Sequence, residues 1–328
     1  MIPLLANQHD WGFVCGRVNI LEGQMLPQSF YMGLLAQERW DDVLRQLQGL
    51  PLESTLTPDL AWDNWAATLE AYYMGMMLSL RANCPDPAVV DLFLLQGQYF
   101  NLKEAVLGGT SEYPPVVFPE KVLKQVAEGD FSALPEPAHG ALTRFRAPVK
   151  AQEQPPALDP LLDATYLRHM LALAAATEAP LIIAYTERWV TSRVIILLWR
   201  ARRMKLAPEA YLRELRPLGK LGELAHSLAG MADLNEWPAV AGSALGPLLD
   251  EAMQAAELRQ IPLFEQRVAE SLLHLAHRGR AQVFGPERVL SFLAEVSHEL
   301  FNLKLAVTGR FKQLEIPALR QELRATYA

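Results

Sequence analysis

Large hydrophobic residues recur along this chain every three or four positions with charged residues between them, which is the pattern of amphipathic α-helices. Residues 29–47 show it clearly, and Ser29 is a suitable N-terminal cap for a helix there. The same spacing predicts further helices over residues 60–82, 86–109, 162–179, 180–203, 208–215, 218–228, 246–280, 286–309 and 316–328. No series of segments alternates apolar and polar residues as β-strands do, so the sequence predicts an all-α fold.

Prolines indicate where several of these helices begin. Pro87, Pro180 and Pro286 each stand at the start of a long predicted helix. A proline is tolerated there because the N–H groups of the first turn have no partner within the helix. Asp86 is the expected cap of the first of these helices, and Gly108 is a suitable residue for ending it.

Two other segments contain prolines at less regular places. Residues 246–280 have the pattern of one long helix, which Pro262 is expected to kink or break because a proline inside a helix removes a backbone hydrogen bond. Residues 134–159 are rich in proline and lack periodicity, and this predicts a long connection.

One eleven-residue stretch is written twice. "YFNLKEAVLGG" at residues 99–109 is nearly repeated by "LFNLKLAVTGR" at residues 300–310. A match at a fixed internal distance is typical of a duplicated structural unit, and amphipathicity alone does not require the same asparagine, lysine and glycine in both copies. The residues of this repeated motif are Asn101, Leu102, Lys103, Asn302, Leu303 and Lys304.

A third, weaker copy is found between them. Val194 lies fourteen positions after Pro180, the same separation as that of Asn101 from Pro87. This copy lacks the motif but keeps the helix length and a basic end. We therefore predict three similar helical modules, which are residues 1–112, residues 113–212 with the proline-rich connection 134–159, and residues 213–328.

Composition and charge narrow the class of protein. The chain has 328 residues, 51% of them hydrophobic, and a net charge of −7, which disfavours nucleic-acid binding. Cys15 and Cys84 are too few for a disulfide scaffold, so a reducing cytoplasm is expected. No targeting segment is evident, and the most apolar stretch, residues 170–185, is too short to span a membrane. The chain is expected to be soluble and to touch a membrane only peripherally or through partners.

Catalytic and metal-binding patterns are missing from the sequence. His274 and His277 share a helix face but have no further ligand residues nearby, which favours a solvated face over a metal site. The zinc-protease pattern suggested by His298 fails because position 302 is asparagine. No phosphate-binding loop or activated nucleophile is found, so neither metal nor cofactor is expected. This combination favours an adaptor over an enzyme.

One basic and one aromatic cluster of side chains also need an interpretation. The basic cluster Arg200, Arg202 and Arg203 ends a predicted helix, where cations suit the helix dipole, but it is also a candidate contact for an acidic partner. The aromatic group is interpreted as core packing, and its members are Trp62, Trp65, Tyr72 and Tyr73.

The chain resembles a known protein family over nearly its whole length, and the matching residues are clearest in the N-terminal and C-terminal segments. Arg17, Val18, Gly23, Leu26 and Phe30 match its opening, and its C-terminal block is matched by Glu287, Glu299, Asn302, Leu303, Lys304, Gly309, Arg310, Ile316, Leu323 and Tyr327. The chain resembles the central-stalk C subunits of the A/V-type rotary ATPases, which are the counterparts of the d subunit of the eukaryotic V-ATPase. It departs from the family at Gln98, where an acidic residue is usual, and at Val194.

The resemblance implies a funnel of three quasi-equivalent helical modules without catalytic activity of its own. It implies a central-stalk adaptor in an ion-transporting or proton-transporting rotary motor, held between the shaft subunits and the membrane proteolipid ring. Such a protein is cytoplasmic and attached to the membrane through its partners. A free-standing helical scaffold that has diverged from this family is the alternative, and an unrecognised all-α enzyme is a third.

The motif residues then have a proposed structural role. Asn101 and Asn302 are expected to lie mid-helix and to cross-link neighbouring helices through side-chain hydrogen bonds, because asparagine is otherwise a poor residue for a helix interior. Lys103 and Lys304 are expected either to pair with nearby carboxylates or to face the shaft.

Overall fold

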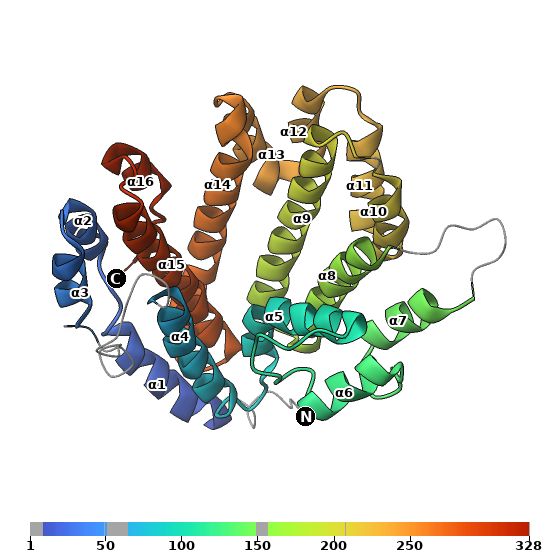
Figure 1. Ribbon diagram of the computed structural model, residues 1–328, viewed down its shortest axis with the longest axis horizontal. Coiled ribbons are helices and arrows are strands. Elements are labelled where there is room, and N and C mark those ends of the chain that lie inside the picture. Colours follow the sequence, from blue (N-terminus) through green and yellow to red (C-terminus); the bar gives the residue numbers. More distant parts are fainter. Residues whose placement is uncertain (1–8, 49, 51–64, 149–156, 207, 328) are drawn as a thin grey trace. The chain divides into compact units, whose positions relative to one another are not determined.

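The structure is a computed structural model that describes residues 9–48, 50, 65–148, 157–206 and 208–327 (Figure 1). Within these ranges the regular structure is entirely helical, which confirms the all-α prediction. Contacts between residues divide the chain into two compact units, one made of residues 1–90 and 269–328 and the other of residues 91–268. We call them unit 1 and unit 2. The division into three modules stays a prediction.

Unit 1 is built around one long helix, α15. Its helices are α1 (Gly12–Glu22), α2 (Gln28–Ala36), α3 (Trp40–Gln48), α4 (Trp65–Arg81), α15 (Pro286–Phe311) and α16 (Ile316–Glu322), with the second half of α14 (Glu257–His277). Helix α15 packs against α1, α2, α3, α4 and α16. Its side chains Val289, Leu290 and Phe292 are fully buried, which places the apolar core of this unit along α15.

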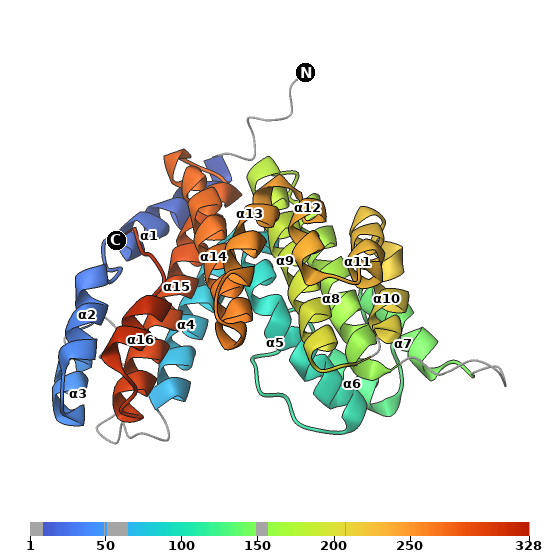
Figure 2. The ribbon, with the colours of Figure 1, turned by 90° about the horizontal axis from the view of Figure 1, so that it is seen from above.

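Unit 2 is centred on the antiparallel pair α8 and α9 (Figure 2). Its helices are most of α5 (Ala88–Leu107), then α6 (Glu120–Glu128), α7 (Ala138–Arg146), α8 (Leu158–Ala176), α9 (Pro180–Arg203), α10 (Glu209–Leu215), α11 (Lys220–Gly230), α12 (Trp237–Val240) and α13 (Gly242–Met253). Helix α8 also contacts α7 and α10, and α9 contacts α11 and α13. Trp199 of α9 is fully buried and is one of the largest side chains of this core.

The helix starts predicted from prolines are confirmed. Pro180 and Pro286 are the first residues of α9 and α15. Helix α5 begins directly after Pro87, and the carboxylate of Asp86 accepts a hydrogen bond of 2.9 Å from the N–H of Ala88. These residues satisfy or omit N–H groups that the helix itself cannot pair.

Several predicted elements are wrong in their boundaries. Residues 29–47 form two helices rather than one, because the backbone is extended at Gln37 after α2; Asp41 and Asp42 in the first turn of α3 are the usual sign of a new start. Ser29 lies inside α2 and is not its cap.

The segments 134–159 and 246–280 also differ from the prediction. Residues 134–159 contain helix α7, which lies between Pro137 and Pro148. Residues 149–156 of this segment are outside the described part. The segment 246–280 is broken between Met253 and Glu257, while Pro262 lies inside α14. A proline at position 262 leaves the backbone carbonyl of Leu258 without its helical partner. This is tolerated because Leu258 is an exposed residue in the first turn of α14.

The ends of other helices were also misjudged. Helix α15 continues two residues past Gly309, and α16 ends at Glu322, so the residues after it are not helical. Helices α1, α6 and α12 had no prediction. Of the aromatic group, Trp65 and Tyr73 are buried in the core as expected, Tyr72 is half-buried, and Trp62 lies outside the described residues.

Candidate functional site

The first copy of the repeated motif holds the chain that follows its own helix. Asn101 is fully buried in α5. Its Oδ1 accepts hydrogen bonds from the backbone N–H groups of Glu112 and Tyr113 at 3.0 and 3.1 Å, and its Nδ2 donates to the carbonyl of Tyr113 at 2.7 Å. A side-chain amide has the same donor and acceptor as a peptide group, so it can pair with backbone outside a helix.

The second copy does the same in unit 1. Asn302 is fully buried in α15, accepts from the N–H of Arg324 at 2.8 Å and donates to its carbonyl at 2.9 Å. Arg324 lies in the non-helical segment after α16. The prediction that the two asparagines bond to neighbouring helices is therefore wrong, because their partners are backbone groups of non-helical segments. Each one clamps irregular backbone, because helices satisfy their own peptide groups and irregular segments do not.

A second polar residue precedes each asparagine by one turn. Gln98 accepts from the N–H groups of Val116 and Val117 at 3.0 and 3.1 Å and donates to the carbonyl of Pro114 at 2.8 Å. The acidic residue that the family resemblance implies at this position could accept these bonds but could not donate to a carbonyl. The departure at Gln98 thus suits the backbone that it holds.

The matching residue in α15 is Glu299, whose partners are both donors. The N–H of Leu26 and the hydroxyl of Tyr73 each donate to its carboxylate at 2.6 Å. Burial raises the pKa of Glu299, and these two hydrogen bonds partly oppose that shift because they stabilise the charged form. A carboxylate suits this place because it faces donors only.

The remaining motif residues divide between core and surface. Leu102 and Leu303 are fully buried. Lys103 forms an ion pair of 2.6 Å with Asp159 of α8, and Lys304 pairs with Glu70 of α4, so the expected carboxylate partners are found for both. Both pairs are partly exposed and are worth at most about 1 kcal/mol each.

The glycine shared by the two copies has a different purpose in each. Gly108 ends α5 with a φ of +78°, a conformation that favours glycine. Gly309 lies inside α15, and a Cβ there would come within 2.5 Å of both δ-carbons of Leu319. Glycine at 309 therefore allows α16 to pack closely on α15.

The three arginines at the end of α9 bind two parts of unit 2, which are helix α14 and the segment directly after α11. Arg200 forms an ion pair of 2.8 Å with Glu265 of α14. Arg202 donates to the carbonyl of Met231 at 2.7 Å and to that of Ala232, directly after α11. Arg203 reaches Glu257 at the start of α14. Partner contact by these arginines stays a prediction, and Arg200 is the most exposed of them.

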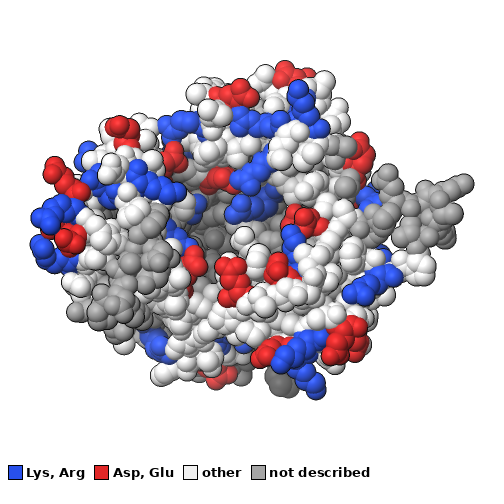
Figure 3. All heavy atoms as spheres, viewed as in Figure 1, with Lys and Arg blue, Asp and Glu red and all other residues white. Residues whose placement is uncertain are grey.

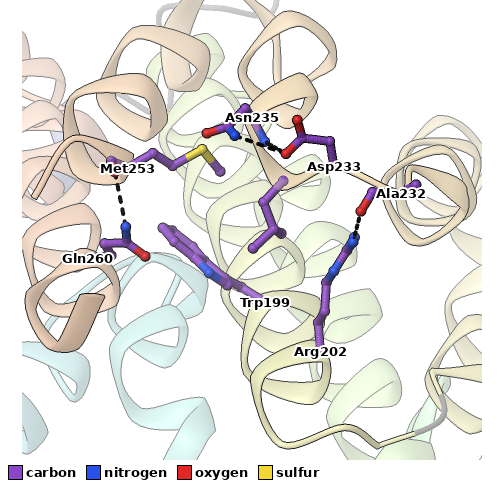
Figure 4. Close-up of a pocket in the computed structure, with 8 residues that line it drawn as sticks. Trp199, Arg202, Ala232, Asp233, Asn235, Met253 and Gln260 are labelled. Carbon is purple, nitrogen blue, oxygen red and sulfur yellow. Dashed lines mark hydrogen bonds between the residues drawn. The ribbon is translucent and has the colours of Figure 1, made fainter. Parts of the chain in front are cut away.

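A pocket of about 320 Å³ lies beside Arg202 (Figure 4). Trp199 and Met253 line it, and Gln260 donates to the carbonyl of Met253 at 3.0 Å. Asp233 accepts from the backbone and the side chain of Asn235 at 2.9 and 3.0 Å. Most of its polar groups are therefore paired with one another, and we regard the pocket as part of the packing between α9 and the α11–α12 connection.

A second concavity of about 350 Å³ follows α9 on another side, and we call it the α9 groove. Its walls come from α5, α8, α9 and α10 with Leu206. The residues that α9 contributes to it are Trp189, Arg193, Ile196, Leu197, Arg200, Ala201 and Met204. Asp163 of α8 also lines it; burial, and secondly the charge of Asp159, raise the pKa of Asp163 to about 6, while Lys103 opposes the shift.

Charge alone does not single out a surface. On the face drawn in Figure 3, acidic and basic side chains lie interspersed over the described residues. Candidate contacts therefore have to be located from concavity and exposed apolar groups, which the α9 groove combines.

The histidines noted in the sequence have structural surroundings. His277 stacks on Tyr327 with ring centroids 4.1 Å apart, and the Nδ1 of His274 lies 3.4 Å from the Tyr327 hydroxyl. His298 is buried and its Nδ1 donates to the carbonyl of Ala325 at 2.9 Å. Among the residues that the structure describes, no group of three histidine, cysteine or acidic side chains could hold a metal ion.

Comparison with protein families matches residues 14–321 to the family described as ATP synthase (C/AC39) subunit. The chain belongs to the C/AC39 family. Members are non-catalytic subunits of A/V-type ATP synthases, so this C/AC39 chain contributes to ion transport by a rotary motor without a catalytic site of its own. No curated protein matches it in a separate comparison. In the parts of the chain described here, no helix is long and apolar enough to cross a membrane.

Gln98 and Glu299 were named from the sequence only through the family resemblance, and neither was given a role in holding backbone. This role could have been found, because each lies three positions before its motif asparagine and hence on the same helix face. The α9 groove could not have been found from the sequence, because its walls come from separate helices and no single segment indicates how these helices pack.

The C/AC39 chain should lose stability in acid partly through His169 of unit 2. This buried side chain packs against both Tyr99 and Phe118, and burial lowers its pKa from 6.5 to about 4. Below pH 6.5 the unfolded chain therefore takes up a proton that the folded chain refuses. Its contribution to stability is complete above that pH and is lost progressively as the pH falls to about 4.

Replacing His169 with phenylalanine should make the melting temperature fall less between about pH 7 and pH 4.5. The measurement is thermal unfolding of the full chain followed by circular dichroism. His226→Gln is the control, since this histidine is exposed in the same unit. An unchanged pH profile for His169→Phe would contradict the assignment. His298, whose pKa is also lowered to about 4 by burial, should keep part of the acid sensitivity in either variant.

Proposed function

We propose that this C/AC39 chain is the adaptor that couples the rotating central shaft of an A/V-type ATPase to the proteolipid ring in the membrane. Family membership over residues 14–321 carries the proposal, since it covers nearly the whole chain. In this role the chain is a cytoplasmic component held at the membrane through its partners, and it needs neither cofactor nor nucleic acid.

The internal ties of unit 1 support a role in transmitting torque. Such a part has to resist twisting, so its helices must be fixed to one another by more than apolar contact, which is non-directional. Helix α15 is joined to α1 by Arg288 with Glu22 and to α4 by Glu299 with Tyr73. Directional bonds of this kind fix the rotation of one helix against the next.

Unit 2 has corresponding ties. Asn101 and Gln98 hold the connection after α5, and Arg200 and Arg203 of α9 are bonded to α14. Close-packed interiors with fixed polar bonds transmit strain rather than absorb it. Each unit is thus suited to pass on a mechanical load.

The test is the coupling itself. A strain lacking the chain should keep ATP hydrolysis by its nucleotide-binding subunits but lose ATP-driven ion uptake into membrane vesicles, and the returned gene should restore it. The tagged chain, purified from membranes in mild detergent, should bring shaft and proteolipid subunits with it. If the strain lacking the chain pumps ions normally and the chain purifies alone, it is a free-standing scaffold and the proposal is wrong.

A further inference from the structure

The α9 groove extends along much of α9. The α9 residues that line it, from Trp189 to Met204, recur at spacings of three and four and therefore lie on one face of the helix. Fifteen steps along a helix correspond to about 22 Å, or four turns. A concavity of this length matches a segment of secondary structure better than a compact small molecule.

The lining of the groove is largely apolar and ends in exposed side chains. Leu167 and Ile196 are buried below it, and Trp189 is half-buried in its wall. At one end Met204 is 68% exposed and Leu206 is 49% exposed. Large apolar side chains gathered at a concavity are typical of binding surfaces, and methionine adapts well to varied partners.

On the α9 wall of the groove, two arginines share one carboxylate partner, and the guanidinium of Arg193 also lies over the Trp189 ring, 4.9 Å from its centroid. Arg193 and Arg200 lie two turns apart and share one carboxylate, that of Glu265, at 3.6 and 2.8 Å. Among the described residues, no ion pair joins either arginine to Asp163, the acidic group on the α8 wall. An occupant with a carboxylate toward α9 would balance the second guanidinium.

We infer that the α9 groove binds an amphipathic helix of another subunit, with large apolar side chains at successive turns in the groove and an acidic residue facing Arg193 and Arg200. A helix about four turns long matches the groove in length, and its apolar side chains at every third or fourth position can enter the concavity of about 350 Å³. The inference rests on the proposed function, because the helix is taken to belong to another component of the same ATPase.

The first experiment is photo-cross-linking in the assembled complex. The photoreactive residue benzoylphenylalanine is placed at position 206, and in a matched control at position 258, where Leu258 is 87% exposed in the same unit outside the groove. Position 206 should give a product with one partner protein, at least about ten-fold above the control. Mass spectrometry should map it to an amphipathic helix with an acidic residue.

The second experiment tests charge and apolar contact separately. Arg200→Glu should reduce the product from position 206 by about ten-fold, and reversing the charge of the mapped acidic residue should restore it. Met204→Asp, an exposed change that leaves the core intact, should also reduce it. Thermal melting of each variant checks that unit 2 is folded.

Three results would overturn the inference. Position 206 could give no product above the control, give only adducts of detergent or lipid, or link to a second copy of this chain. Each of these results contradicts the inference only if the unmodified chain purifies with the ATPase. If it does not, the proposed function has failed, and the two failures are thereby distinguished.

Discussion

Arg288→Met should lower the free energy of unfolding by about 3–5 kcal/mol, the usual result of leaving one partner of a buried ion pair alone. Arg288 of α15 is 6% exposed, and its guanidinium donates to both carboxylate oxygens of Glu22 and, at 2.7 Å, to Asn19. The substitution leaves the carboxylate of Glu22, whose side chain is only 8% exposed, without this partner. Urea unfolding of the full chain measures the loss, and hydrogen exchange of α1 and α15 amides locates it.

Two further variants separate the ion pair from simple loss of an arginine. Arg39→Met removes an exposed arginine paired with Asp41 and should change stability by less than about 1 kcal/mol. Adding Glu22→Gln to Arg288→Met should recover part of the loss, because no unpaired buried charge then remains. Arg280 lies 3.8 Å from Glu22. If Arg288→Met alone is nearly neutral, Arg280 suffices and the buried pair has no such importance.

The sequence predicted those features of the fold that are set locally. The starts of α9 and α15 follow from Pro180 and Pro286, since a proline restricts the backbone wherever it stands. The break after α2 was missed because both halves of residues 29–47 have helical periodicity. Only the acidic pair Asp41 and Asp42 indicates a second start.

For the repeated motif and the basic cluster, the sequence indicated which residues matter, but it did not indicate which groups they bond to. That Asn101 and Asn302 are buried and bonded follows from finding asparagine twice in a helix interior. Their partners lie in segments 11 to 22 residues further along the chain, and only the folded path brings those segments back. In the same way, the cluster of Arg200, Arg202 and Arg203 is visible in the sequence. Its division among Glu265, the end of α11 and the start of α14 depends on tertiary packing.

The repeat has a structural explanation. In both units a motif asparagine holds irregular backbone, a leucine next to it enters the core, and a lysine one position later pairs with a carboxylate of another helix. The shared residues thus perform the same three tasks in α5 and α15. The glycine does not, since Gly108 ends one helix and Gly309 makes room for Leu319 beside the other. A duplicated unit can keep a residue while its use changes.

Asn302→Ala should destabilise the chain by about 1–3 kcal/mol, because it leaves the N–H and carbonyl of Arg324 without their partner. Asn302→Asp should be no better, since a carboxylate can accept from the N–H of Arg324 but faces its carbonyl with a second acceptor. Urea unfolding measures both losses. Hydrogen exchange at Arg324 should accelerate in both variants, because its amide proton loses or weakens its bond.

Lys304→Ala is the matched control for this clamp. It changes a residue of the same motif two positions away, whose pair with Glu70 is partly exposed, so stability should change by less than about 1 kcal/mol. A clear difference between the two alanine variants assigns the repeat to backbone clamping rather than to surface charge. Equal effects, or an Asn302→Ala variant as stable as the original chain, would show that the segment after α16 is held by its other contacts. Those contacts include the bond from His298 to Ala325, the stacking of Arg324 on Phe301 and the packing of His277 against Tyr327.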